Sequence, residues 1–319
     1  MVLQYKGSAG TPGSLGTTPG ATPRGIYGPL NFKEVNAATG SATRAAKSLP
    51  IPPPWHSSTI IRAAVVDFKL GDGMPVTQQV RQGSLPNCPI AAILSALGNT
   101  KDGQKYLDSL IKQIKGAPVV TTLSGDLVAK LWHSDEDADD KPQAPELRSD
   151  RYFSVTVKNF KKPIEVHDTF YIKYTDGADR DLVFMNSPAG VLWPSVIEKA
   201  CALHYGSYPA MSDYKKLTAN DFWELLLGSP PQGGFKVEDS TDIEKIRDAA
   251  RAAPRVPTIA ASRMPVPDGA PVTQWHAHAV LGMTGKNIDL YDPAKAKIIS
   301  IEFEEFRRDF QTVLFGNSP

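Results

Sequence analysis

The order of the helical and extended patterns limits most strongly what this chain can fold into. Residues 87 to 227 carry the apolar spacing of several helices, and strand-like runs dominate after residue 228. This segregation predicts an α+β fold, because α/β folds alternate strands and helices along the chain. A chain with a helix-rich part and a strand-rich part invites a functional site in the cleft between them.

The helices are predicted by their end signals and apolar spacing. The first begins after an Asn87 cap, has Pro89 in its first turn, and stops at Gly98-Asn99. It is apolar nearly all round, so we expect it to be buried. The other predicted helices are a stripe of Leu107, Leu110, Ile111 and Ile114, then Trp193 to Gly206, Thr218 to Leu227 and Ile243 to Ala253.

Alternating and β-branched runs predict the strands, and Gly285-Lys286-Asn287 suits a tight hairpin between two of them. The predicted strands are Tyr152 to Val157, Phe170 to Tyr174, Leu182 to Met185, Val256 to Ala261, His278 to Met283, Asn287 to Tyr291 and Lys297 to Phe303.

Composition changes near residue 60. The first 60 residues hold 8 Gly and 8 Pro, and Glu34 is their only acidic residue against five basic ones. Such a segment buries too little apolar surface to offset its ordering entropy. We therefore expect a disordered arm or linker over 1–60, a helix-rich part over 61–227 and a β-rich part over 228–319.

Several classes of protein are excluded by length, charge and cysteine content. The 319 residues have a net charge of +1, which gives no reason to expect a nucleic-acid partner. No run of about 18 apolar residues predicts a bilayer span, and two cysteines cannot build a disulfide scaffold. The first ten residues lack the order of a secretory signal, so we expect synthesis in the cytoplasm.

A cysteine, a glutamine, a histidine and an aspartate form a constellation that could perform nucleophilic catalysis. Cys88 stands at the start of the first helix, where unpaired N–H groups and the helix dipole favour a thiolate. Gln82 precedes it by six residues and could donate to a developing oxyanion. His276 and His278 enter one predicted strand and Asp292 lies on the next, so the hairpin would set an imidazole beside a carboxylate. Together they supply a nucleophile, a base and an orienting group.

Spacing alone leaves a structural alternative for Cys88, and several other features of the sequence have plainer explanations than a functional site. Cys88 could be a small buried residue of a core helix, as we expect for Cys201. Trp275 could shield the base from water or fill the core. The acidic run Asp135–Asp140 fits a solvated loop better than a cation site. The remaining histidines show no metal-ligand spacing with cysteines; they are His56, His133, His167 and His204.

Longer segments resemble the calpain family of cysteine proteases. Gln82–Ala92 (QGSLPNCPIAA) is similar to the calpain nucleophile segment, and His276–Val280 (HAHAV) to the calpain histidine motif. Leu182–Gly190 (LVFMNSPAG) and Leu192–Ala200 (LWPSVIEKA) between them also resemble the family, and the second of these blocks is the most specific part. Phe303–Phe306 with Phe310 resembles the helix and strand that close the calpain core. The resemblance runs in family order from about residue 75 to the C-terminus.

The resemblance implies the papain-like two-lobe fold of the calpain core, with the cysteine on a helical lobe and the histidine and aspartate on an antiparallel β-rich lobe. It implies Cys88 as nucleophile, His276 as base, and Gln82 in the oxyanion hole. His278 then occupies the family's tyrosine position. Asp292 departs from the family's asparagine, although a carboxylate can still hold an imidazole. On either side of Cys88, Asn87 and Pro89 depart from the aspartate and tryptophan of the family.

Calcium control is not expected. Gln79 stands in the loop where calcium-gated calpains place an aspartate ligand, and an amide weakens such a site. The sequence contains no EF-hand loop. We therefore expect no cofactor and no metal.

The leading hypothesis is a calcium-independent cysteine endopeptidase that acts on protein substrates through Cys88, His276 and Asp292. An exported effector or toxin, and autoprocessing at the arm, are roles that the isolated core behind a flexible arm suggests. Two alternatives stay open. One is a papain-fold deamidase or acyl transferase acting on protein glutamine, and the other is a catalytically silent binding module.

Overall fold

This computed structural model describes residues 32–33, 60–66, 69–71, 73–115, 151–174, 180–206, 208–211, 216–316 and 319. Contacts divide the chain into two units, Met1–Leu30 and Asn31–Pro319, and all described residues belong to the second. Of the predicted arm, only Phe32–Lys33 and Ile60 are described. The acidic run Asp135–Asp140 also lies outside the described residues. The predicted boundaries at residues 60 and 227 stay predictions.

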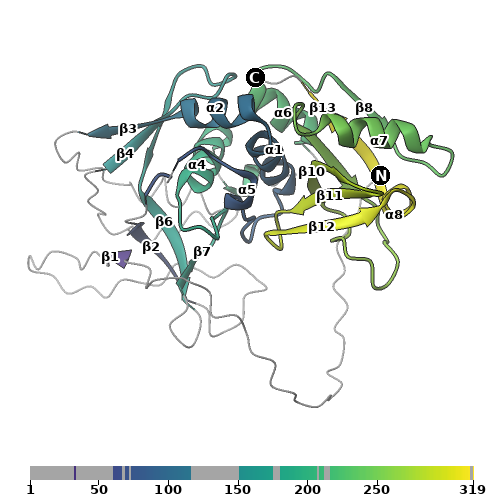
Figure 1. The fold of residues 1–319 in the computed structure, drawn as a ribbon. Helices are drawn as coiled ribbons and strands as arrows, with labels where there is room; N and C mark the ends of the chain where they lie inside the picture. Colours follow the sequence, from purple (N-terminus) through teal and green to yellow (C-terminus); the bar gives the residue numbers. More distant parts are fainter. Residues whose placement is uncertain are drawn as a thin grey trace, which may run out of the picture. The chain divides into compact units, whose positions relative to one another are not determined.

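The fold is mixed α+β, as the sequence predicted, with antiparallel sheets. Its helices are α1 (Cys88–Gly98), α2 (Lys101–Leu110), α4 (Trp193–Tyr205), α5 (Tyr208–Met211), α6 (Ala219–Leu227), α7 (Ile243–Ala252) and α8 (Phe303–Asp309), with a short 3-10 turn at Thr77–Gln79. α1 is buried along its whole length, as its nearly all-apolar surface predicted, and it packs against β9 and β10 (Figure 1). Among the described residues, no helix is long and apolar enough to span a bilayer.

A six-stranded antiparallel sheet is built entirely from the last ninety residues. Its strand order is β12-β11-β10-β9-β13-β8. The strands are β8 (Gly233–Lys236), β9 (Thr258–Ser262), β10 (Ala277–Thr284), β11 (Asn287–Asp292), β12 (Lys297–Glu302) and β13 (Phe310–Phe315). β10 and β11 form the predicted hairpin, which turns at Gly285 with a φ of 62°. This hairpin brings the start of β10 beside the end of β11.

Two smaller antiparallel sheets accompany the helices of the first part. One has the order β1-β2-β6-β7 and the other β3-β4-β5. Their strands are β1 (Phe32–Lys33), β2 (Ile60–Val66), β3 (Ile111–Lys115), β4 (Arg151–Val155), β5 (Ile164–His167), β6 (Thr169–Tyr174) and β7 (Arg180–Leu182). The sequence therefore underestimated the strand content before residue 228.

Two sequence predictions are wrong in this part. The helical stripe ends at Leu110, and Ile111 and Ile114 belong to β3, which pairs with β4. β-branched residues fit a paired strand, so pairing overrides the helical spacing here. The strand predicted over Leu182–Met185 ends at Leu182. Val183 N still donates to Tyr171 O in β6, but the Val183 carbonyl accepts from Ser84 N and Met185 N donates to the Glu198 carboxyl group, so the chain leaves the sheet here.

Hydrophobic packing forms two buried clusters. One gathers α1, α4, α6 and the small sheets, and the other lies between the six-stranded sheet and helices α7 and α8. Hydrogen bonds join the segment before α1 to the end of β11: Tyr291 Oη donates to Val80 O over 2.6 Å, and Gln82 N donates to Pro293 O over 2.9 Å. At the other end of α1, Asn99 Nδ2 donates to Leu281 O over 2.8 Å. These bonds fix α1 against the sheet.

Candidate active site

Cys88 is the first residue of α1 and is 7% exposed. The predicted helix limits are confirmed, with Asn87 at the cap position and Pro89 in the first turn. The predicted capping role of the Asn87 side chain is wrong. That side chain makes no bond to the helix and donates instead to Oε1 of Glu198 over 2.6 Å. The thiol thus lies at a helix N-terminus, where the helix dipole favours negative charge.

Glu198 supports the nucleophile from α4 and was not singled out as a site residue from the sequence. It is completely buried, and its Oε2 accepts from Met185 N over 2.8 Å. Burial raises its pKa to about 7 against the lowering effect of the hydrogen bonds from Asn87 and Met185. The sequence did hold one hint: Glu198 lies within the segment Leu192–Ala200 (LWPSVIEKA), on which the family resemblance partly rests.

The hairpin brings His276 and Asp292 together, as predicted. His276 immediately precedes β10 and Asp292 ends β11, and Nε2 of His276 lies 3.4 Å from Oδ1 of Asp292. Asp292 is completely buried. Its Oδ2 accepts from Thr273 Oγ1 over 2.6 Å, and its Oδ1 accepts from Ala294 N over 2.9 Å. These bonds fix the carboxylate that faces the imidazole.

The electrostatics favour a charged imidazolium and carboxylate. Burial alone would lower the pKa of His276, but its interactions with Asp292 and Cys88 outweigh burial and raise that pKa to about 9. Burial alone would raise the pKa of Asp292, but His276 and Thr273 hold it well below its usual range. Cys88 therefore interacts directly with an imidazole that holds its proton strongly.

His278 lies in the same cluster but has a different character. It is completely buried, its Nδ1 lies 3.3 Å from the carbonyl oxygen of His276, and its Nε2 lies 3.8 Å from Oδ2 of Asp292. Burial and the neighbouring His276 lower its pKa to about 3. An uncharged histidine in this position can support Asp292, whereas His276 is the one that interacts with Cys88.

Gln82 lies on the segment before α1, and both its backbone N–H and its side-chain amide are hydrogen bonded. Its Nε2 donates to Leu85 O over 2.5 Å, which leaves a second N–H on the amide for the predicted oxyanion role. Gly83 lets the chain pass against Phe184, since a Cβ there would come within 2.2 Å of that residue's carbonyl group. Gln82 does not line the pocket at Cys88, so its predicted role stays a prediction.

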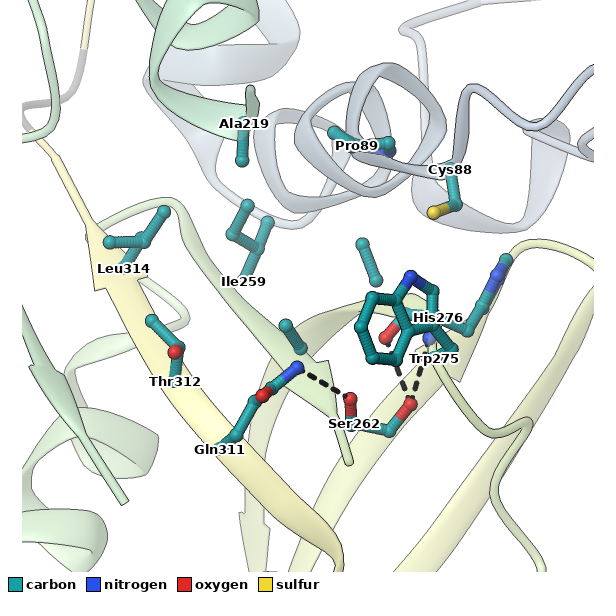
Figure 2. Close-up of a pocket in the computed structure, with 12 residues that line it drawn as sticks. Cys88, Pro89, Ala219, Ile259, Ser262, Trp275, His276, Gln311, Thr312 and Leu314 are labelled. Carbon is teal, nitrogen blue, oxygen red and sulfur yellow. Dashed lines mark hydrogen bonds between the residues drawn. The ribbon is translucent and has the colours of Figure 1, made fainter. Parts of the chain in front are cut away.

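A pocket of about 140 Å³ opens beside Cys88 and His276. Figure 2 shows the Cys88 sulfur and the Trp275 indole at this pocket, with Ser262 hydrogen bonded to Gln311 and to His276. Its lining is mainly apolar and consists of Cys88, Pro89, Ala219, Ile259, Ala261, Ser262, Trp275, His276, Ala277, Gln311, Thr312 and Leu314. The arrangement offers a nucleophile and a base at the edge of a site for an apolar group.

The remaining candidates lie elsewhere. Cys201 is completely buried in α4, and burial raises the pKa of its thiol. Oε1 of Gln79 accepts from the Trp193 indole over 2.6 Å, so this oxygen satisfies a buried donor. His204 stacks on Phe160, while His56 and His133 fall outside the described residues. In the described part of the chain, no three His, Cys, Asp or Glu side chains could hold a metal ion.

No protein-family model matches the chain, and none of the curated proteins does. The case for a function therefore rests on the geometry of Cys88, His276 and Asp292.

Proposed function

We propose that this protein is a cysteine endopeptidase with a papain-like core of the calpain type, active without calcium. One observation carries the proposal: Cys88 begins a buried helix and interacts with His276, whose Nε2 faces the buried Asp292 over 3.4 Å. A nucleophile, a base and an orienting carboxylate in this order are the requirements of thiol acyl transfer. The two buried clusters and the pocket beside Cys88 are compatible with a substrate cleft between two lobes.

The proposed reaction begins with proton transfer from Cys88 to His276. Because Nε2 faces Asp292, Nδ1 is the ring nitrogen left to take the thiol proton. The Cys88 sulfur then attacks the carbonyl carbon of the peptide bond, and the electron pair of the C=O bond moves to oxygen. The amide of Gln82 and the N–H groups at the start of α1 would stabilise this oxyanion.

The intermediate collapses with cleavage of the C–N bond. The imidazolium of His276 gives its proton to the departing amine, which leaves as a neutral group and leaves a thioester on Cys88. Water then attacks the thioester while His276 takes one of its protons, and the acid product leaves as the thiol is restored. Asp292 keeps the imidazole oriented and stabilises its positive charge throughout.

A covalent probe tests the proposal. An irreversible peptidyl epoxide is expected to add once to the wild-type protein and to Cys201→Ser, with or without chelator, and not to Cys88→Ser. Cys201 is the matched control because it is the second cysteine and is buried away from the pocket. Intact mass measures the labelling. Absence of labelling in the folded wild-type protein would contradict the proposed function, and labelling only with added Ca²⁺ would contradict calcium independence.

The chemistry of the product separates peptide cleavage from glutamine chemistry. Incubation of the wild-type protein with an unstructured protein substrate is expected to give shorter peptides with new amino termini. A mass increase of about one dalton on intact chains would indicate deamidation instead, because the same thioester can form on a side-chain amide.

A further inference from the structure

Trp275 combines exposure with an unusual backbone. Its side chain is 50% exposed and lines the pocket, although it immediately precedes the base His276. Its φ is 52°, in the left-handed region that bulky residues rarely adopt. The exposure contradicts the alternative that Trp275 fills the core. A strained, exposed aromatic residue beside a nucleophile calls for a functional explanation.

The neighbouring hydrogen bonds hold this backbone in place. Trp275 N donates to Arg263 O over 3.0 Å, and His276 N donates to Ser262 Oγ over 2.9 Å. Ser262 N in turn donates to the His276 carbonyl over 2.9 Å. The end of β9 therefore fixes Trp275 on both sides of its strained position. The same bonds that orient His276 present the indole to the pocket.

The pocket is shaped for an apolar group of modest size. Ile259, Ala261 and Leu314 line it from the sheet, and the half-exposed side chain of Trp275 lines it beside His276. A cavity of about 150 Å³ accommodates a group of the size of benzene, and this pocket measures about 140 Å³. A single aliphatic side chain or one small ring therefore fits.

We propose that Trp275 is a specificity-determining residue whose indole covers an apolar side chain of an extended polypeptide substrate in this pocket. The inference rests on the proposed function and names the substrate class of the same site. Without the indole, the bound side chain would lose the cover on its solvent side. Large aromatic residues contribute apolar contact at low entropic cost, so this one side chain can dominate the discrimination.

Two alkylating reagents test the inference on the full chain. Iodoacetamide reports the reactivity of Cys88 alone, whereas a peptidyl epoxide with a leucine side chain also needs the pocket. In Trp275→Gly, the ratio of the epoxide rate constant to the iodoacetamide rate constant is expected to fall about tenfold or more. Trp275→Phe is expected to keep this ratio within about threefold of wild type, because the ring is retained. Ile298→Ala is the control, since Ile298 is 48% exposed on β12 and does not line the pocket.

Glycine also separates a binding role from a structural one. Because relief of the strain at a φ of 52° offsets the larger unfolded-state entropy of glycine, Trp275→Gly is expected to unfold within about 5 °C of the wild-type temperature. A much lower unfolding temperature would indicate a packing role and overturn the inference. An unchanged rate ratio in Trp275→Gly would overturn it as well.

Labelling of the wild-type protein separates failure of the proposed function from failure of the role of Trp275. If its Cys88 reacts with iodoacetamide but never with the epoxide, the proposed function fails, and the inference fails with it. If both reagents label wild type and the ratio is the same in Trp275→Gly, only the inference fails.

Discussion

Asn87 donates its side-chain amide to Glu198 over 2.6 Å, and both residues are completely buried. Since Asn87 immediately precedes Cys88, this bond joins α4 to the start of the helix that carries the thiol. Burial raises the pKa of Glu198 to about 7, while the hydrogen bonds from Asn87 and Met185 act in the opposite direction. The side chain next to Cys88 is therefore held by a carboxyl group, that of Glu198, with a pKa near neutral pH.

Replacing Glu198 with glutamine is expected to change how stability depends on pH. The folded protein binds this proton more tightly than the unfolded chain, whose glutamate has a pKa of 4.5. The contribution is therefore fully present below pH 4.5 and is lost as the pH rises to about 7. Over that range, wild type should lose up to about 3 kcal/mol of unfolding free energy relative to Glu198→Gln.

Urea unfolding of both proteins at several pH values between 4.5 and 7.5 measures this difference. Glu224→Gln is the control, since Glu224 is exposed on α6. Parallel stability curves for wild type and Glu198→Gln would contradict the assignment of a titrating group to Glu198.

Asp292→Asn is expected to narrow the pH range over which the protein cleaves peptides. Burial lowers the pKa of His276, and the interaction with Asp292 helps to raise it to about 9. A neutral amide at position 292 removes that contribution, so the pKa of His276 should fall. The basic limb of the pH profile for peptide cleavage should therefore move to lower pH by about one unit or more, because the imidazolium that protonates the leaving amine is lost earlier. We expect peptidase activity at pH 7 to fall roughly tenfold or more.

The matched control is Asp289→Asn on the same strand, because Asp289 bonds only Thr284 and Ser300 among the described side chains. A basic limb that stays at the same pH in Asp292→Asn would show that the carboxylate does not hold the imidazolium.

The two neighbouring histidines are expected to differ sharply in importance. His276→Gln removes the imidazole that interacts with Cys88, so peptidase activity should fall about a thousandfold or more. His278→Gln removes an uncharged neighbour of Asp292, so activity per folded molecule should fall less than about tenfold. Activity is measured on a peptide substrate and normalised by circular dichroism. The reverse order of losses would assign the base to His278.

Local signals in the sequence were sufficient for the elements that carry the site. Asn87, Pro89 and Gly98 predicted the limits of α1, and Gly285 predicted the hairpin that brings His276 to Asp292. These features depend on residues close together in the chain. The calpain-like segments added roles for Cys88, His276 and Gln82, which stay predictions.

Contacts between distant residues could not be read in this way. The side chain of Asn87 bonds Glu198, 111 residues further along the chain. Local sequence shows only an asparagine before a helix, which predicts a cap. Ile111 carries a helical apolar spacing, yet pairing with Val155 places it in a strand. The backbone at Trp275 is held by a bond from Trp275 N to Arg263 O, and by bonds between the next residue, His276, and Ser262, which no local pattern records. Tertiary partners decide such positions.

Gly83 is expected to tolerate no side chain. A Cβ at this position would lie 2.2 Å from the carbonyl carbon and oxygen of Phe184, and backbone atoms cannot move aside as a flexible side chain can. Gly83→Ala should therefore lower the free energy of unfolding by about 1–3 kcal/mol. It should also reduce epoxide labelling of Cys88, because Gln82 and the start of α1 belong to the same segment. Gly71→Ala is the control, since its Cβ would have no contact closer than 3.7 Å. Urea unfolding and intact mass measure the two effects, and wild-type stability in Gly83→Ala would mean that the segment can shift away from Phe184 without loss.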